Sequence, residues 1–480
     1  MPLYWLSMTA PPLPTSPASN PEAMTICPGC GRAVAVASDI CRFCWHPMRG
    51  VAADPEGAAR VLAAEARQHA WRRRRSLLLR FALLAAVVWF AWYQWYPDST
   101  PVPLPASATR GVVGATIDPL RWPLPDGDVA RTRSTAARPN LNAAEAWRIR
   151  LGSLATTGLV ATADAIYVGV SEGALLALST RDGHELWRVP VAGQIDAAPA
   201  LAGDRLYVGL RDGSLAAIDA RDGRQVWRAG RGASVFTSPV VDAGVVYVTS
   251  GRGDVRAFDA EDGRQLWERA PKEALGSAVP LAIGAGVLAV VAGDEVDLID
   301  RMTGQETYFY RMRAPVAALA HDREVIALGR QSLTAFGVEQ RRPWWEPARM
   351  WWGQFWLQGL LPAPPGQPSR WVAGAPAGGI APAIAGELLI VAATGGAVRA
   401  HDLRTGEERW SASVGRLVFP PVATAAGVLL LEADALVWLD AATGVVRGRQ
   451  PLPGERFSSV AVTDGGSYLL SRGSDIVALR

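Results

Sequence analysis

The stretch that decides the fold is LYVGLRDGSLAAIDARDGRQVW, residues 206–227. Short apolar runs alternate in it with Asp-Gly pairs at 212–213 and 222–223. Asp-Gly is a strong signal for a tight hairpin turn, because such turns need residues that accept positive φ. The stretch therefore predicts short antiparallel strands joined by tight turns.

Tryptophans extend this pattern along the chain, since Trp147, Trp187, Trp227 and Trp267 recur at a spacing of 40 residues. A fixed period of this size indicates an array of supersecondary units. Helical repeats of similar length are excluded by the Gly-rich turns and by the lack of a 3.6-residue period. Four short strands in about 40 residues are typical of a β-propeller blade.

Seven such units can be counted, at about 156–190, 196–230, 236–270, 278–312, 315–375, 380–413 and 419–452. The last residues, 458–480, supply only three strands. Residues 146–149 (AWRI) can supply the missing outer strand, which would close the ring and remove its sheet edges. We therefore expect an all-β, eight-bladed propeller of four-stranded antiparallel blades over residues 143–480.

The repeats resemble those of quinoprotein-type (PQQ) propellers, whose docking motif is AxDxxTGxxxW. The motif is matched fully or in part by Ala217/Asp219/Gly223/Trp227, Ala257/Asp259/Gly263/Trp267, Ala400/Asp402/Thr405/Gly406/Trp410 and Ala177/Ser179/Gly183/Trp187. The resemblance implies that Trp147, Trp187, Trp227, Trp267 and Trp410 are wedges between neighbouring blades, where each ring buries a large apolar area. Three units depart from the motif: Tyr308 and Gly448 stand in place of the Trp in blades four and seven, and blade five is interrupted.

The same resemblance bears on chemistry. Quinoprotein dehydrogenases need a Ca²⁺ ligand set, a catalytic Asp and typically a vicinal disulfide, but no Cys follows Cys44. The repeat aspartates occupy one equivalent place per blade, which favours turn capping over catalysis. We expect no catalytic residue and no PQQ, as in the non-enzymatic BamB-type scaffolds. A ligand sensor and a dehydrogenase with a degenerate site remain alternatives.

All four cysteines lie near the N-terminus, as Cys27-Pro-Gly-Cys30 and Cys41-Arg-Phe-Cys44. Two CxxC knuckles supply four sulfur ligands for a tetrahedral structural zinc, with no position left open. The pattern resembles the small zinc ribbons at the N-termini of many bacterial membrane proteins and covers residues 24–48. Two disulfides or a redox CxxC are the alternatives.

A membrane anchor is expected next. Asp54-Pro55-Glu56 reads as the start of a juxtamembrane helix over 54–76, and residues 77–96 form a 20-residue apolar run broken only by Arg80. Arg72–Arg75 place the N-terminal side in the cytoplasm, and aromatics crowd the far end. We expect a single-pass protein of the bacterial inner membrane with a periplasmic propeller, a disordered tail over 1–23 and a linker over 97–142. A cleaved signal peptide is the alternative.

A Trp-rich insertion interrupts blade five over residues 341–372. Inserted loops on a rigid ring usually carry binding, and clustered Trp beside Arg is typical of interaction hot spots. The insertion is expected either to contact a protein partner or the membrane, or to fold as a lid on the propeller. The residues concerned are Trp344, Trp345, Trp351, Trp352 and Trp356.

Net charge limits the partners. With 48 Lys+Arg against 45 Asp+Glu, the net charge of +3 is too small for nucleic-acid binding by bulk electrostatics. We therefore expect protein partners on the ring face and the insertion, the membrane on 77–96, and no nucleic acid. The expected role is a scaffold in envelope protein assembly or in a membrane complex.

Overall fold

A computed structural model describes residues 24–95, 121–140, 143–270, 281–338, 352, 355, 369–452 and 456–480. The chain divides into two compact units, residues 1–96 and 97–480.

The first unit is a small two-stranded sheet followed by one long helix. Strand β1 (Met24–Ile26) pairs antiparallel with β2 (Ala33–Ala35), and α1 runs from Pro55 to Trp95. Asp54 caps the helix, because its Oδ1 accepts a hydrogen bond from the Gly57 N–H at 2.9 Å. A Cβ on Gly57 would lie 2.8 Å from Ile26 Cδ1, so the first turn of α1 lies against β1.

Helix α1 is continuous through the segments expected as a juxtamembrane helix and a membrane span. Within the part of the chain that the structure describes, no helix is both long enough and apolar enough to cross a membrane.

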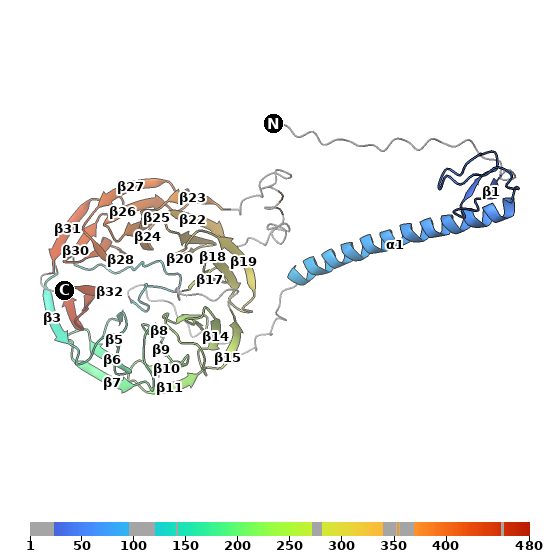
Figure 1. Ribbon diagram of the computed structural model, residues 1–480. Helices are drawn as coiled ribbons and strands as arrows, with labels where there is room; N and C mark the ends of the chain where they lie inside the picture. Colours follow the sequence, from blue (N-terminus) through green and yellow to red (C-terminus); the bar gives the residue numbers. More distant parts are fainter. Residues whose placement is uncertain are drawn as a thin grey trace. The chain divides into compact units, whose positions relative to one another are not determined.

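The second unit is a ring of eight four-stranded antiparallel sheets, the blades (Figure 1). This confirms the fold class expected from the 40-residue period. Blades one to four are β4 (Val160–Ala161), β5 (Ala165–Val170), β6 (Ala174–Ser179) and β7 (Glu185–Pro190); β8 (Ala200–Ala202), β9 (Arg205–Gly209), β10 (Leu215–Asp219) and β11 (Gln225–Ala229); β12 (Val240–Asp242), β13 (Val245–Thr249), β14 (Val255–Asp259) and β15 (Gln265–Arg269); and β16 (Ala282–Gly284), β17 (Val287–Ala292), β18 (Glu295–Asp300) and β19 (Glu306–Arg311).

The other four blades complete the ring. They are β20 (Ala317–His321), β21 (Glu324–Leu328), β22 (Ser332–Gly337) and β23 (Trp371–Gly374); β24 (Gly379–Ala385), β25 (Leu388–Ala393), β26 (Ala397–Asp402) and β27 (Glu408–Ser413); β28 (Leu417–Thr424), β29 (Gly427–Glu432), β30 (Ala435–Leu439) and β31 (Val446–Pro451); and β32 (Phe457–Thr463), β33 (Gly466–Ser471), β34 (Asp475–Leu479) and β3 (Glu145–Arg150).

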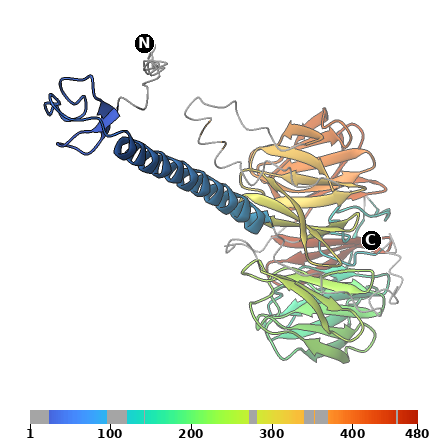
Figure 2. The ribbon, with the colours of Figure 1, turned by 90° about the vertical axis from the view of Figure 1, so that its right-hand side faces the viewer.

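Blade eight joins the two ends of the propeller, as expected. Strand β3 pairs with β34, with Trp147 opposite Ala478 and Ile149 opposite Ile476. In Figure 2 the red C-terminal strands lie between the orange blades above them and the green blades below them. This pairing completes the fourth strand of blade eight and closes the ring, in which each blade keeps only a short outer edge strand.

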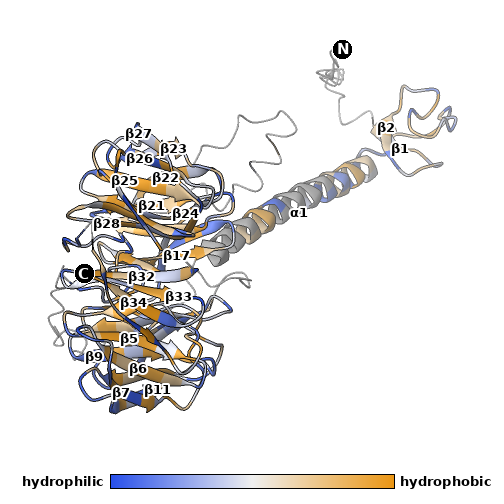
Figure 3. Ribbon diagram, turned by 90° about the vertical axis from the view of Figure 1, so that its left-hand side faces the viewer, coloured by the Kyte–Doolittle hydropathy of each residue, from blue (hydrophilic) through white to orange (hydrophobic). Residues whose placement is uncertain are grey.

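The burial of each strand follows from its place in the blade. Middle strands such as β6 are buried at every residue, because a neighbouring blade covers each face of the sheet. Outer strands such as β7 alternate between exposed and half-buried residues. Figure 3 shows the apolar middle strands in orange and the polar connections in blue.

The inside of the ring holds a segment that we had expected to be part of a linker. Residues 121–140, named here the central segment, run along the ends of the innermost strands. Backbone hydrogen bonds join it to blades one, two, four, five, six and seven. The contacts are Trp122 with Ala161, Pro123 with Leu201, Val129 with Ile283, Ala130 with Ala320, Thr132 with Ile384, and Arg133 and Thr135 with Ala423.

Candidate functional site

The four cysteines of the first unit come together in one cluster. Their sulfur atoms all lie within 4.8 Å of one another, and Cys27 and Cys41 are buried. Cys27 Sγ lies 3.6 Å from Cys44 Sγ, and Cys30 Sγ lies 3.7 Å from Cys41 Sγ. Sulfurs around a tetrahedral zinc are about 3.8 Å apart, given Zn–S bonds of about 2.3 Å. The cluster is therefore consistent with a structural metal such as zinc.

Two equivalent turns build the cluster. The Gly31 N–H donates to the Cys27 carbonyl at 2.8 Å, and the Trp45 N–H donates to the Cys41 carbonyl at 2.8 Å. Gly31 and Trp45 both have positive φ, 68° and 61°. Each turn thus presents two sulfurs on one side, which is the local geometry expected of a zinc knuckle.

The electrostatics of the cluster also suit a cation. Burial raises the pKa of Cys41, but hydrogen bonds from the backbone N–H groups of Phe43 and Cys44 outweigh it and lower that pKa to about 6. The backbone N–H of His46 lowers the pKa of Cys44, whereas desolvation and the three neighbouring thiols raise it to about 12. Four thiolates this close repel one another, so they need a bound cation to be ionised together.

The alternatives for these residues can be compared with the geometry. All four cysteines are free, and the sulfur–sulfur distances of 3.6 and 3.7 Å are well above the bonded distance of about 2.05 Å. His46 packs beside Gly29, where a Cβ would lie 2.8 Å from the imidazole Cγ. The geometry thus describes four thiols around one centre.

In the propeller, the five motif tryptophans lie at the junctions between blades. Each indole Nε1–H donates to a backbone carbonyl of the next blade, which joins the two sheets. The distances are 2.8 Å for Trp147 to Thr180, 3.2 Å for Trp187 to Ala220, 3.1 Å for Trp227 to Ala260, 3.1 Å for Trp267 to Arg301 and 3.0 Å for Trp410 to Ala441.

The same contacts explain why glycine recurs in the motif. A Cβ on Gly263 would lie 2.6 Å from the Trp227 ring, and one on Gly304 would lie 2.7 Å from the Trp267 ring. Both glycines also have positive φ, 77° and 71°. The indole of one blade therefore covers the turn glycine of the next blade, and any side chain there would displace it.

Trp371 is a sixth docking tryptophan, which the sequence pattern missed. It begins β23 in blade five, donates to the Leu403 carbonyl at 2.9 Å and covers Gly406. The insertion expected over 341–372 therefore ends before residue 371, a correction to its boundary. The Trp-to-Gly spacing, 35 residues here, could have identified it, since Trp267 and Gly304 are 37 residues apart.

The repeat aspartates cap turns. Asp219 accepts from the Arg221 N–H at 2.9 Å, and Asp259 accepts from the Glu261 N–H at 2.8 Å. Asp300, Asp402 and Asp440 accept equivalent backbone hydrogen bonds. This confirms turn capping as their structural role.

Most of the Trp-rich insertion lies outside the described residues. Of its five tryptophans, Trp344, Trp345, Trp351 and Trp356 lie outside, and only Trp352 is described, as a half-buried helical residue. Phe355 is 44% exposed. The binding role expected of these tryptophans stays a prediction.

The Ca²⁺ and PQQ of the dehydrogenases can be tested against the donor residues. Over the described ranges, the four cysteines form the one group of three or more His, Cys, Asp or Glu residues that could hold a metal. No carboxylate set for Ca²⁺ is gathered in the described part of the propeller, and the chain has no Cys there for a vicinal disulfide. The expectation that the propeller binds no PQQ, and the alternative of a dehydrogenase with a degenerate site, both stay predictions.

Comparisons with known proteins point to the same fold. BamB from Moraxella catarrhalis is 17% identical with a TM-score of 0.55, over 70% of this chain and 97% of that one. The quinohemoprotein alcohol dehydrogenase of Comamonas testosteroni is 15% identical with a TM-score of 0.54, over 78% of this chain and 82% of that one. The computationally designed Ika8 protein is 14% identical with a TM-score of 0.55, over 70% and 99%. At these identities the likeness concerns the fold alone.

A comparison with curated protein sequences gave no match. The family model described as outer membrane protein assembly factor BamB, however, matches residues 135–270, 211–341, 251–417 and 394–480. These overlapping matches extend over the whole propeller and over more than half of the chain. The chain therefore belongs to this BamB family of PQQ-like repeat propellers.

Proposed function

We propose that the propeller is a protein-binding scaffold without catalytic activity, serving envelope protein assembly or a membrane complex. The observation that carries the proposal is a set of exposed apolar side chains on the ring. Leu154 is 58% exposed, Phe236 47% and Val316 46%. Exposed apolar groups that gather on one face of a folded domain are typical of interaction sites.

These three residues share one face of the ring. Each lies in the connection that leads into an innermost strand, namely β4, β12 or β20. Their neighbours contact the end of the second strand of the same blade: Ala155 pairs with Val170, and Val235 with Ser250. Because corresponding ends of antiparallel strands lie on the same side of a propeller, Leu154, Phe236 and Val316 lie on one face of the ring, which we propose as the binding face.

The binding face can be tested by substitution. Leu154→Ser, Phe236→Ser and Val316→Ser combined in the full chain should abolish co-purification of a cross-linked partner after mild detergent extraction. The matched control is Leu186→Ser, Val445→Ser and Val446→Ser, which changes exposed apolar residues at or beside the outer strands β7 and β31. Loss in the control, or retention in the first variant, would contradict the assignment of this face.

The Trp-rich insertion belongs to the same proposal as a second contact for a protein or membrane partner. Its support is the sequence alone: five of the 19 tryptophans fall within residues 344–356. Replacing residues 341–368 by a short Gly-Ser linker, with a folded propeller confirmed by circular dichroism, should weaken partner recovery. Unchanged recovery would favour the lid interpretation.

We further propose that the four-cysteine cluster holds zinc and that residues 77–96 anchor the protein in the inner membrane, with the propeller in the periplasm. The apolar run of the sequence supports the anchor, as do Phe81, Leu83 and Leu84 in α1, which are 65%, 70% and 59% exposed. Alkaline carbonate extraction should leave the full chain in the membrane, and protease added to spheroplasts should digest the propeller. Release by carbonate would exclude the anchor.

A further inference from the structure

Two buried arginines of the central segment face a single carboxylate. Arg131 and Arg133 are 6% and 7% exposed, and Asp126 is 8% exposed. Asp126 forms ion pairs with both, through Oδ2 to Arg131 Nη1 and through Oδ1 to Arg133 Nη2. One carboxylate balances one guanidinium, so this group carries an excess positive charge away from water.

The guanidinium groups of Arg131 and Arg133 also have fewer hydrogen-bond acceptors than donors. Arg131 Nε donates to the Leu281 carbonyl at 2.7 Å. Arg131 Nη2 and Arg133 Nη1 are buried and have no hydrogen-bond partner among the described residues. Desolvation lowers the pKa of Arg133 to about 9, because burial disfavours its charged form. Buried donors on a charged group without an acceptor are costly, so the arrangement calls for an anion.

The other acid of the segment does not supply that anion. Asp128 accepts hydrogen bonds from the Thr132 backbone N–H, at 2.9 Å, and from the Thr132 hydroxyl. It lines a separate, wider hollow together with Ser134 and His321. The net charge of the group formed by Asp126, Arg131 and Arg133 therefore stays positive.

The backbone of the segment brings both arginines to Asp126. Arg131 and Arg133 are buried, Thr132 between them is half-buried, and the two guanidinium groups pair with different oxygens of the Asp126 carboxylate. Both arginines have positive φ, 60° and 50°, which L-residues other than Asn and Asp rarely adopt. Hydrogen bonds to Ala320, Ile384 and Ala423 of blades five, six and seven hold the segment in this conformation. Strain of this kind collects at ligand sites.

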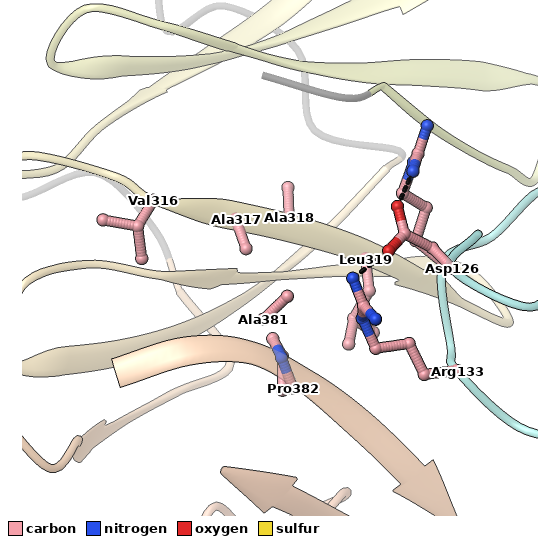
Figure 4. A pocket seen from close by; sticks show the side chains of 9 residues that line it. Asp126, Arg133, Val316, Ala317, Ala318, Leu319, Ala381 and Pro382 are labelled. Atoms are coloured by element: carbon pink, nitrogen blue, oxygen red, sulfur yellow. Dashed lines mark hydrogen bonds and ion pairs between the residues drawn. The ribbon is translucent and has the colours of Figure 1, made fainter. Parts of the chain in front are cut away.

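A cavity of about 210 Å³ adjoins these groups. Figure 4 shows Asp126 and Arg133 at one side and the apolar side chains of the inner strands at the other. The apolar lining residues are Val316, Ala317, Ala318, Leu319, Ala381 and Pro382. A water molecule occupies about 30 Å³ in the liquid, so the cavity has room for a molecule of several heavy atoms.

We propose that this cavity binds a small aliphatic carboxylate. Its carboxylate accepts hydrogen bonds from Arg133 Nη1 and Arg131 Nη2 and cancels the excess charge. Its hydrocarbon part lies against the alanine, valine and proline side chains from blades five and six. Guanidinium groups match the planar carboxylate, and the apolar walls favour an organic acid over chloride or phosphate. The cavity shares Val316 with the proposed binding face, but its charged groups belong to the central segment, so the proposal does not depend on that face.

Titration calorimetry of the full chain in chloride-free, low-salt buffer tests the proposal, with butyrate as the probe. One butyrate should bind per chain, and Arg133→Met should weaken binding by about tenfold or more, since two charged hydrogen-bonding groups become one. The matched control is Arg138→Met, an exposed arginine of the same segment, which should bind as the wild type does. Equal affinity of Arg133→Met and wild type would overturn the proposal.

Two further arms separate the outcomes. Arg133→Met leaves a neutral Asp126–Arg131 pair and should fold. If it does not fold, Ala381→Leu provides the test, because it fills the cavity from its apolar wall and leaves the charges in place. Ala381→Leu should weaken the binding of butyrate at least tenfold. Chloride and phosphate are titrated alongside. Binding of these inorganic ions that matches or exceeds butyrate would overturn the assignment to an organic acid, whereas a clear preference for butyrate supports it.

Discussion

Removing the metal from the four-cysteine cluster, or substituting Cys41 by Ser, is expected to unfold residues 24–54 and to leave the propeller folded. The apolar cluster of this unit consists of Cys27, Val34, Cys41, Met48 and the half-buried Val51, which is too small a core to hold a domain. Zinc bound by four thiolates contributes about 10–16 kcal/mol to folding in sites of this type.

The full chain should therefore contain one zinc per molecule by elemental analysis. Hydrogen exchange should show fast amides over 24–54 after chelation and unchanged protection in the blades. His46→Ala is the control and should keep its zinc, because four sulfurs complete the shell. Zinc lost from His46→Ala, or amides over 24–54 that stay protected without metal, would contradict the assignment.

The second large effect is expected at the docking tryptophans. Trp267 is 8% exposed, donates to the Arg301 carbonyl at 3.1 Å and lies 6.0 Å from the Tyr247 ring between centroids. Trp267→Ala removes this wedge between blades three and four, and should cost about 3–5 kcal/mol of unfolding free energy. Trp371→Ala should cost a similar amount, since Trp371 is 7% exposed, donates the equivalent hydrogen bond to the Leu403 carbonyl and covers Gly406.

Scanning calorimetry of the full chain provides the measurement. Trp267→Ala and Trp371→Ala should each lower the Tm of the propeller transition clearly below that of the wild type. Trp267→Phe keeps a ring and loses the indole hydrogen bond, so it should cost only about 1–2 kcal/mol. Trp45→Ala, at a residue 75% exposed in the other unit, should leave the propeller Tm unchanged. A Trp371→Ala variant with the wild-type Tm would show that blade five docks by other contacts.

Several features were predictable because they are local. Each blade is built by hairpins between neighbouring segments, so Asp-Gly pairs and tryptophans at 40-residue spacing were enough to count the blades. The outer strand at residues 146–149 was predictable from the strand count, since the last unit has three strands and a blade needs four. The two CxxC pairs likewise predicted the four-cysteine cluster, because their spacing places the sulfurs on two tight turns.

Other features were not predictable because their contacts are distant in sequence. Trp371 was assigned to the insertion, since the insertion moves it out of the 40-residue period. The central segment has no repeat and no sustained apolar period, so its sequence predicts a linker. Its partners, from Ala161 to Ala423, lie tens to hundreds of residues away, so nothing near it in sequence marks its position.

The sequence by itself determined the kind and number of blades and the four-cysteine cluster, because turn chemistry and ligand spacing act over a few residues. It also determined the closure of the ring, because the last unit lacked one strand and residues 146–149 could supply it. Only the tertiary structure decided what fills the ring. The sequence alone gives no reason to distinguish Arg131, Arg133 and Asp126 from other charged residues of a linker. These three residues become a buried, positively charged group only when the blades close around them, because burial and hydrogen-bond satisfaction depend on the assembled ring.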